Sequence, residues 1–169
     1  MVVVRREEPR DIPAVRYVNE RAFGRPAEAN LVDALRGRQK VTLSLVAVQD
    51  DQVLGHILFS PITIEAGEKV FHAVGLAPMA VLPERQRQGI GSLLVRIGLA
   101  ECRKAGYECV VVLGHPEYYP RFGFVPASKY GMTCEYDVPD EVFMAIELRE
   151  GALLGRAGTA KYQSEFNEV

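Results

Sequence analysis

The segment that most constrains the fold is an amphipathic helix predicted between two apolar runs. Between Gly89 and Ala105, apolar residues recur at i, i+3, i+4 and i+7, beginning at Ile90, and Gly106 follows as a helix stop. Residues 70–81 before this helix and residues 109–113 after it are apolar runs of the kind found in buried strands. This order of strand, helix and strand favours an α/β fold with a strand covered on both faces.

The remaining pattern adds strands and helices on either side of this unit. Predicted strands cover residues 2–6, 41–48, 53–64 and 142–148, predicted helices follow Asp11 and cover residues 27–35, and a short helix covers residues 117–122. Asp11 is the expected N-cap of the first helix. The sum is a three-layer sandwich, with a mixed sheet of about seven strands and helices on both faces. Residues 1–169 are expected to form a single domain, in which residues 151–169 are a C-terminal extension.

Two residues inside the apolar run 70–81 predict an irregular strand. Gly75 and Pro78 lie within it, and both residue types weaken a regular ladder, so we expect a bulge or a splayed edge there.

Charge and composition exclude several classes of protein. The chain has 20 Lys and Arg against 22 Asp and Glu, a formal charge of -2, and no long run of one sign, so no nucleic-acid footprint is visible. Residues 1–10 have neither the apolar core of a signal peptide nor a membrane-spanning length. We therefore expect a cytoplasmic protein that binds neither nucleic acid nor membrane.

The cysteines and histidines indicate neither a metal site nor a redox site. The three cysteines (Cys102, Cys109 and Cys134) lack C-x-x-C spacing, and the three histidines are scattered. We expect the cysteines to be reduced and mostly buried, and we expect no metal. No G-x-S-x-G elbow is present, which disfavours a hydrolase.

The chemistry is concentrated in the turn between the irregular strand and the long helix. The first turn of a helix offers free backbone N–H groups and a positive dipole end, which together bind phosphate. Gly89 and Gly91 allow a diphosphate to approach the backbone closely, and Arg85 and Arg87 are placed to contact further phosphate oxygens. The sequence therefore predicts a diphosphate site at this turn.

Two motifs resemble the GNAT superfamily of acetyltransferases. Gln86, Gly89 and Gly91 match its acyl-CoA motif, which is Gln or Arg, two residues, Gly, one residue, then Gly or Ala. In residues 118–124, an aromatic pair followed by Gly-Phe matches a second family pattern, and Tyr119 occupies the position of the family's recurrent active-site tyrosine. By element order the resemblance covers residues 2–148.

The resemblance implies an acetyl-CoA-dependent N-acetyltransferase in which the fourth and fifth strands splay apart around the pantetheine arm. The residues it assigns to the cofactor are Met79, Ala80, Val81, Gln86, Arg87, Gln88, Gly89, Ile90, Gly91 and Ser92. It implies direct attack of an amine on the thioester, without a covalent enzyme intermediate. In that reaction Tyr119 hydrogen-bonds the departing thiolate, because a phenol is a weaker acid than a thiol.

Several points stay open at this stage. Glu28, Glu65, Glu84, His115 or water could deprotonate the amine, and the acceptor is a small-molecule amine, an antibiotic or a protein or peptide amine. The acyl-chain preference is undetermined, and the C-terminal extension either packs on the domain or helps to form a homodimer. The alternatives in function are a non-catalytic acyl-CoA sensor or interaction module, and a different phosphate-ligand protein.

Overall fold

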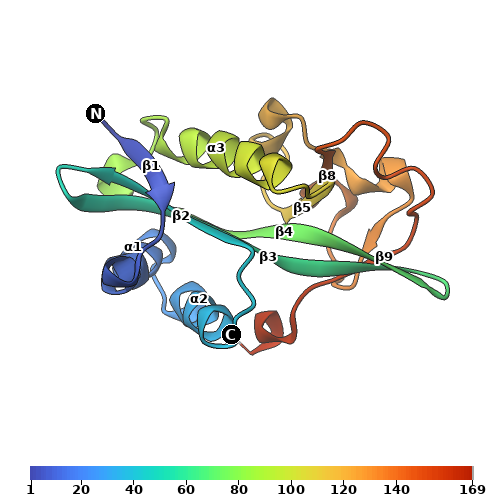
Figure 1. Cartoon of the computed structure of the whole chain (residues 1–169), viewed down its shortest axis with the longest axis horizontal. Helices are drawn as coiled ribbons and strands as arrows, with labels where there is room; N and C mark the ends of the chain where they lie inside the picture. Colours follow the sequence, from blue (N-terminus) through green and yellow to red (C-terminus); the bar gives the residue numbers. More distant parts are fainter. Residues whose placement is uncertain (169) are drawn as a thin grey trace. The chain divides into compact units, whose positions relative to one another are not determined.

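The structure is a computed structural model, and it describes residues 1–168. Its nine strands form one mixed sheet in the order β1-β2-β3-β4-β5-β8-β6 (Figure 1). β9 pairs with β3, and β7 pairs with β9. The strands are β1 (Val3–Arg6), β2 (Leu43–Gln49), β3 (Gln52–Ala66), β4 (Lys69–Val81), β5 (Cys109–Leu113), β6 (Val125–Pro126), β7 (Thr133–Cys134), β8 (Phe143–Glu147) and β9 (Thr159–Lys161). The α-helices are α1 (Ile12–Phe23), α2 (Ala27–Gly37) and α3 (Ile90–Lys104). The predicted α/β class and mixed sheet are confirmed, with nine described strands where about seven were predicted, and β6, β7 and β9 lie outside every predicted range.

The chain is divided into two compact units, each assembled from segments that are distant in sequence. The first unit contains Met1–Ser60, Ala77–Gly98 and the residues from Ser164 on, and the second contains Pro61–Leu76 and Leu99–Gln163. The single domain expected from the sequence stays a prediction.

In the first unit, β2 and β3 form a hairpin with a two-residue turn. Gln49 pairs with Gln52, and the two residues between them, Asp50 and Asp51, have φ of 51° and 62°. Positive φ at both central residues is the type I′ geometry, whose twist matches that of the flanking strands. The turn lies between the strands predicted over residues 41–48 and 53–64.

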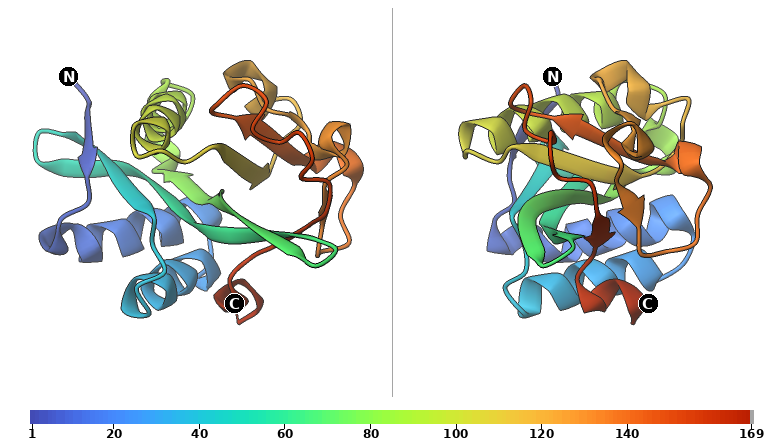
Figure 2. Two further views of the ribbon diagram at one scale, coloured as in Figure 1. Left: turned by 45° about the vertical axis from the view of Figure 1, so that its right-hand side comes forward. Right: turned by 90° about the vertical axis from the view of Figure 1, so that its right-hand side faces the viewer.

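The two faces of β3 in this unit are covered by different helices, which Figure 2 shows on opposite sides of the strand. On one face a Cβ at Gly55 would lie 3.0 Å from Leu94 of α3. On the other face the His56 ring is 3.2 Å from the Asn19 amide of α1. Because side chains alternate along a strand, the even-numbered residues between Gly55 and Ser60 face α1 and the odd-numbered ones face α3. The predicted layers of helix on both faces of the sheet are present in this unit.

Gly98 sets how closely α3 approaches β3, and we predict that a single methyl group there destabilises the protein. A Cβ at Gly98 would lie 2.6 Å from two ring atoms of the fully buried Phe59. Gly98→Ala should therefore lower the free energy of unfolding by about 1–3 kcal/mol in urea titrations. The matched control is Gly37→Ala in α2, where a Cβ meets nothing within 4 Å, so stability should stay the same or rise by up to about 1 kcal/mol. Equal effects of the two variants would contradict the packing argument.

Asp11 precedes α1 as predicted, but its side chain does not cap that helix. Its carboxylate accepts the backbone N–H of Glu8 at 2.7 Å and two bonds from Arg5, at 2.7 and 3.0 Å. These bonds lower the Asp11 pKa, with the Arg5 hydrogen bonds as the largest cause. The cap was mispredicted because a strand arginine and the preceding 3-10 turn, Pro9–Asp11, compete for the same oxygens.

The second unit contains the parallel part of the sheet. Val74, Gly75 and Leu76 of β4 pair in parallel with Val110–Val112, and β8 continues antiparallel to β5. Gly75 is in regular register, so the bulge expected there is wrong. Its lack of a side chain instead admits Tyr162, since a Cβ at Gly75 would lie 3.1 Å from that ring. The irregular bond of β4 is the cis peptide between Ala77 and Pro78.

The C-terminal extension packs on its own chain. β9 pairs with Thr63–Glu65 of β3, which makes it a strand that the sequence did not predict. Within the first unit, the buried Glu165 accepts hydrogen bonds from Arg38 at 2.8 Å and from Lys40 at 3.0 and 3.1 Å. Of the two expectations for this segment, packing on the domain is thus confirmed, and the homodimer stays a prediction.

The Glu165 ion pairs predict a stability difference that depends on pH. The hydrogen bond from Arg38, followed by that from Lys40, lowers the Glu165 pKa from 4.5 to about 2. A lowered carboxyl pKa stabilises the fold above pH 4.5, and this contribution disappears as the pH falls toward 2. In urea titrations, Glu165→Gln should be less stable than wild type at pH 7, and the difference should vanish between pH 4.5 and 2.

The control for this prediction is Glu168→Gln, which removes a half-exposed carboxylate from the same arginine. Exposed ion pairs contribute little, so this variant should unfold like wild type at pH 7. A Glu165→Gln difference that persists at pH 2 would contradict the assignment.

Within residues 1–168, no helix is long and apolar enough to cross a membrane.

Candidate active site

The end of β4 is fixed by two hydrogen bonds, which position the turn that follows it. The Leu82 backbone N–H donates to the Leu54 carbonyl at 2.9 Å, and Gln86 Nε2 donates to the Val81 carbonyl at 3.0 Å. Ala80 and Val81 bury their side chains, and Met79 is partly exposed. The Gln86 amide therefore supports the strand end, and polar contacts to a ligand from residues 80 and 81 are limited to their backbone.

The predicted turn is exposed and leads directly into α3. Residues 86–89 are exposed, and Arg87 and Gly89 have left-handed φ values of 63° and 85°. A Cβ at Gly89 would meet nothing within 4 Å, so its backbone is open on that side. The first helical bond runs from the Leu93 N–H to the Gly89 carbonyl, at 3.0 Å. The N–H groups that precede Leu93 thus belong to the first turn, where no helical carbonyl is available to them.

Ile90 can offer a ligand only its backbone groups, because its side chain is buried. Its side chain is 4% exposed, and its Cγ2 lies 3.2 Å from the position of a Cβ at Gly55. Gly91 and Ser92 complete the first turn of α3 and are partly exposed. Residues 86–92, seven of the predicted cofactor residues, thus form the turn before α3 and the first turn of that helix, and their binding of a cofactor stays a prediction.

The two arginines of the turn differ in how they are held. Arg85 donates from Nη2 to Gln49 Oε1 at 2.7 Å and from Nε to Gln88 Oε1 at 3.1 Å. Arg87 is exposed, and within residues 1–168 its guanidinium has no hydrogen bond or ion pair. Within residues 1–168, neither guanidinium has a carboxylate partner.

Tyr119 lies in the second unit, at the start of a 3-10 turn (Tyr119–Phe122) that replaces the longer predicted helix. Pro120 follows it directly and confines the helical turn to this short form. The ring is 7% exposed and stacks edge-on against Tyr118 and Phe124, with centroid distances of 5.1 and 5.7 Å. Burial raises the Tyr119 pKa to about 12. Within residues 1–168 no hydrogen bond engages its hydroxyl, which leaves it free to donate to a ligand.

The four candidate bases lie in different settings. Glu28 accepts two bonds from Arg25, and the side-chain hydrogen bond lowers the Glu28 pKa, which makes it a weaker base. Glu84 is exposed and is 3.1 Å from Arg21. Glu65 is exposed near the end of β3, and the exposed His115 lies in the loop after β5. None of them is distinguished as the base by its contacts.

Neither a cysteine nucleophile nor a metal cluster accompanies these residues. Cys102 and Cys109 are buried, and burial raises the Cys109 pKa to about 11, so its reactive thiolate form is disfavoured at neutral pH. All three cysteines are free thiols, as predicted. Within residues 1–168, no three His, Cys, Asp or Glu side chains group closely enough to hold a metal ion.

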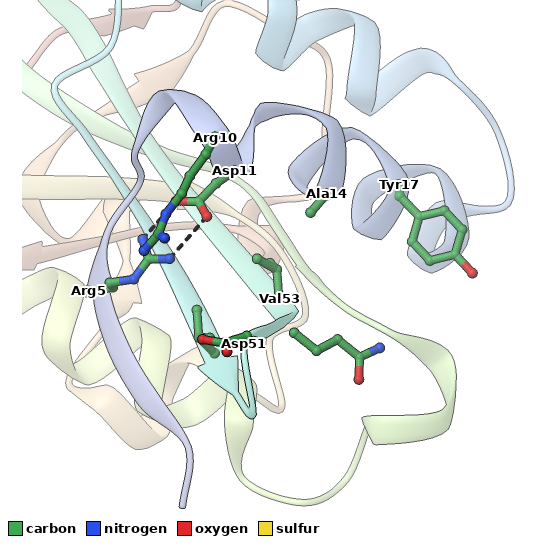
Figure 3. Close-up of a pocket in the computed structure, with 9 residues that line it drawn as sticks. Arg5, Arg10, Asp11, Ala14, Tyr17, Asp51 and Val53 are labelled. Carbon is green, nitrogen blue, oxygen red and sulfur yellow. Dashed lines mark hydrogen bonds and ion pairs between the residues drawn. The ribbon is translucent and has the colours of Figure 1, made fainter.

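A pocket of about 550 Å³ in the first unit contains none of the predicted site residues (Figure 3). Its lining includes Arg5, Asp11, Tyr17, Asp51 and Val53. Arg5 and Asp11 neutralise each other at one end of it, where Figure 3 shows their ion pair. The pocket therefore does not coincide with the turn predicted to bind a diphosphate.

Two residues that the sequence did not single out shape the candidate site. Gln49 accepts a hydrogen bond from Arg85, which lies 36 positions later in the sequence, so no local sequence pattern indicates this role of Gln49. A Cβ at Gly114 would overlap the Tyr119 ring, which means that only glycine permits the present position of that tyrosine.

Comparison with known proteins identifies the family. The family model described as "Acetyltransferase (GNAT) domain" matches residues 3–127. The chain is 36% identical to the uncharacterized N-acetyltransferase YhbS of Escherichia coli (strain K12), over 98% of this chain and 99% of that protein.

Two solved structures resemble the chain over nearly its whole length. The structure of E. coli YhbS in complex with CoA superposes with a TM-score of 0.93, at 36% identity, over 98% of this chain and 92% of that one. A GNAT family acetyltransferase from Brucella melitensis, in complex with acetyl-CoA, gives a TM-score of 0.80 at 38% identity, over 98% of each chain. The fold, the matched model and these relatives agree, and the chain belongs to the GNAT family of N-acetyltransferases.

Proposed function

We propose that the protein transfers an acetyl group from acetyl-CoA to a primary amine, and that the CoA pyrophosphate binds the first turn of α3. The observation that carries this proposal is the exposed, left-handed turn at Arg87–Gly89, which opens the first backbone N–H groups of α3 to a ligand. The CoA and acetyl-CoA complexes of the two similar structures support the choice of ligand.

The pantetheine arm is proposed to contact the backbone of residues 79–81. The buried side chains of Ala80 and Val81 leave backbone N–H and C=O groups as the polar groups of this segment. A splayed edge between β4 and β5 would free these groups for the thioester carbonyl, where a donor stabilises the developing oxyanion. The splaying stays a prediction.

The proposed reaction is a direct displacement. The neutral amine nitrogen attacks the thioester carbonyl carbon, the C–N bond forms, the C–S bond breaks, and CoA leaves as a thiolate. The proton lost by the amine passes to solvent or a base, and the thiolate is protonated as free CoA thiol. The enzyme contributes chiefly alignment of the two substrates and oxyanion stabilisation.

Tyr119 is proposed to stabilise the departing thiolate by a hydrogen bond from its hydroxyl. With a phenol pKa of about 12 and a thiol pKa near 8.5, full proton transfer would be uphill by about 5 kcal/mol. A hydrogen bond without net transfer is therefore the favoured role, and its strength grows as negative charge develops on sulfur.

For the proton of the amine, the ion pairs of Glu28 and Glu84 disfavour these two carboxylates. His115, Glu65 and water stay as the proposed acceptors. The amine itself is not specified, and small-molecule amines, antibiotics and protein or peptide amines are all retained. The cytoplasmic location stays a prediction.

The test is acceptor-dependent release of CoA thiol from acetyl-CoA, followed with a thiol reagent. The panel should hold small polyamines, aminoglycosides, peptides with a free N-terminus and peptides with an internal lysine. Release that requires both acetyl-CoA and one class of amine supports the transferase. Tight acetyl-CoA binding with no release across the whole panel would favour the alternative, a non-catalytic acyl-CoA sensor.

A further inference from the structure

Arg85 differs from its neighbours in being held by neutral groups alone. Its two side-chain partners, Gln49 Oε1 at 2.7 Å and Gln88 Oε1 at 3.1 Å, are both amide oxygens. Several other arginines of the same unit, among them Arg16 and Arg36, each bond at least one carboxylate. A carboxylate partner would cancel most of the field of a guanidinium, whereas an amide partner orients it and leaves its charge intact.

The motif at the turn has one charge of its own, on the exposed Arg87, whose guanidinium no partner orients within residues 1–168. Its first position is the uncharged Gln86, and the amide of Gln86 is engaged by the Val81 carbonyl. The Arg85 bonds use Nε and one N–H of Nη2, and a guanidinium has five N–H donors. Within residues 1–168 no partner engages Nη1, which leaves this nitrogen for an anion.

We propose that Arg85 is an oriented cation that binds the CoA phosphates at this turn beside Arg87, and that Gln49 is the positioning residue that orients it. The inference rests on the proposed function, since it presumes that CoA binds here. Gln49 is the last residue of β2 and pairs with Gln52 beside the two-residue type I′ turn, so its side chain is anchored to a short, defined hairpin. The hairpin thereby orients the Arg85 guanidinium, which has no carboxylate partner and also bonds Gln88 of the turn proposed to bind phosphate.

The test is calorimetric titration of CoA and of pantetheine, which lacks the phosphates, into four variants. Arg85→Gln and Gln49→Glu should each weaken CoA binding about tenfold or more, the second because a carboxylate neutralises the arginine without releasing it. Gln49→Leu removes the acceptor and should weaken CoA binding by about 3–10-fold. The matched control, Gln52→Glu, adds the same charge to a residue that makes no hydrogen bond to Arg85, so it should weaken CoA binding clearly less than Gln49→Glu does. Pantetheine binding should be unchanged throughout.

The outcomes separate this inference from the proposed function. Wild-type CoA affinity in Arg85→Gln or Gln49→Glu would overturn the inference, and so would an equal loss of pantetheine affinity, since that would report a general disturbance of the site. Failure of the wild-type protein to bind CoA at all would instead overturn the proposed function.

Discussion

Replacing Gly89 with glutamate is expected to abolish CoA binding, with a dissociation constant raised at least about 100-fold. A side chain at this position points into the space left open at the turn, where nothing lies within 4 Å of a Cβ. Its carboxylate would meet the pyrophosphate, and two unit charges 4 Å apart repel by about 4 kcal/mol near a protein surface. Calorimetric titration of CoA into the purified variant measures the loss.

The effect of placing any side chain on a left-handed backbone has to be separated from the effect of the negative charge that Gly89→Glu adds. Gly89 has φ of 85°, and Gly106, just beyond the other end of α3, has φ of 91° with equally open space around a Cβ. Gly106→Glu therefore imposes the same left-handed strain, about 1–2 kcal/mol, away from the phosphate turn. It should bind CoA like wild type. Full CoA affinity in Gly89→Glu would remove the turn from the cofactor site.

Replacing Tyr119 with phenylalanine is expected to lower kcat by about 10–150-fold while CoA affinity stays within about threefold, because the lost bond forms chiefly to the charged thiolate. The ring packs against Tyr118 and Phe124, and phenylalanine preserves these contacts, so the fold should be retained. Steady-state kinetics with a productive acceptor measure kcat, and calorimetry measures CoA affinity.

The control and the pH profile sharpen this prediction. Tyr118→Phe removes the hydroxyl of the adjacent, partly exposed tyrosine and should leave kcat unchanged. Since the Tyr119 pKa is raised to about 12, its phenol stays protonated and able to donate up to about pH 10. The rate should therefore show no alkaline decline from this group below that pH. Unchanged turnover in Tyr119→Phe would exclude the tyrosine from the mechanism.

The elements that could be predicted from the sequence are those whose signal is local and repeated. The helical period from Ile90 on located α3, and the apolar run at Cys109–Leu113 located β5 at its observed bounds. β7 and β9 have two and three residues, too short for a pattern, and β9 forms because residues almost 100 positions earlier in β3 pair with it. Pairing of that kind depends on the tertiary fold and leaves no trace in a short window of sequence.

The same distinction applies to the site. The spacing of Gln86, Gly89 and Gly91 located the turn, because a helix N-terminus and left-handed backbone require particular residues at fixed positions. The contact between Gln49 and Arg85 joins two separate elements, and neither residue type indicates the other. For Asp11 the position before α1 was predicted correctly, but the partner of its carboxylate was not, because the carboxylate binds Arg5 and does not cap the helix.

Thermal unfolding with acetyl-CoA, CoA, ATP and NAD at matched concentrations tests the claim that this turn binds CoA in preference to other phosphate ligands. A ligand at 100 times its dissociation constant adds about 2.7 kcal/mol to the free energy of unfolding, so acetyl-CoA and CoA should each raise the unfolding temperature of the wild-type protein. ATP and NAD should leave it nearly unchanged. No shift with either CoA ligand, or a larger shift with ATP or NAD, would contradict the claim and favour a different phosphate ligand.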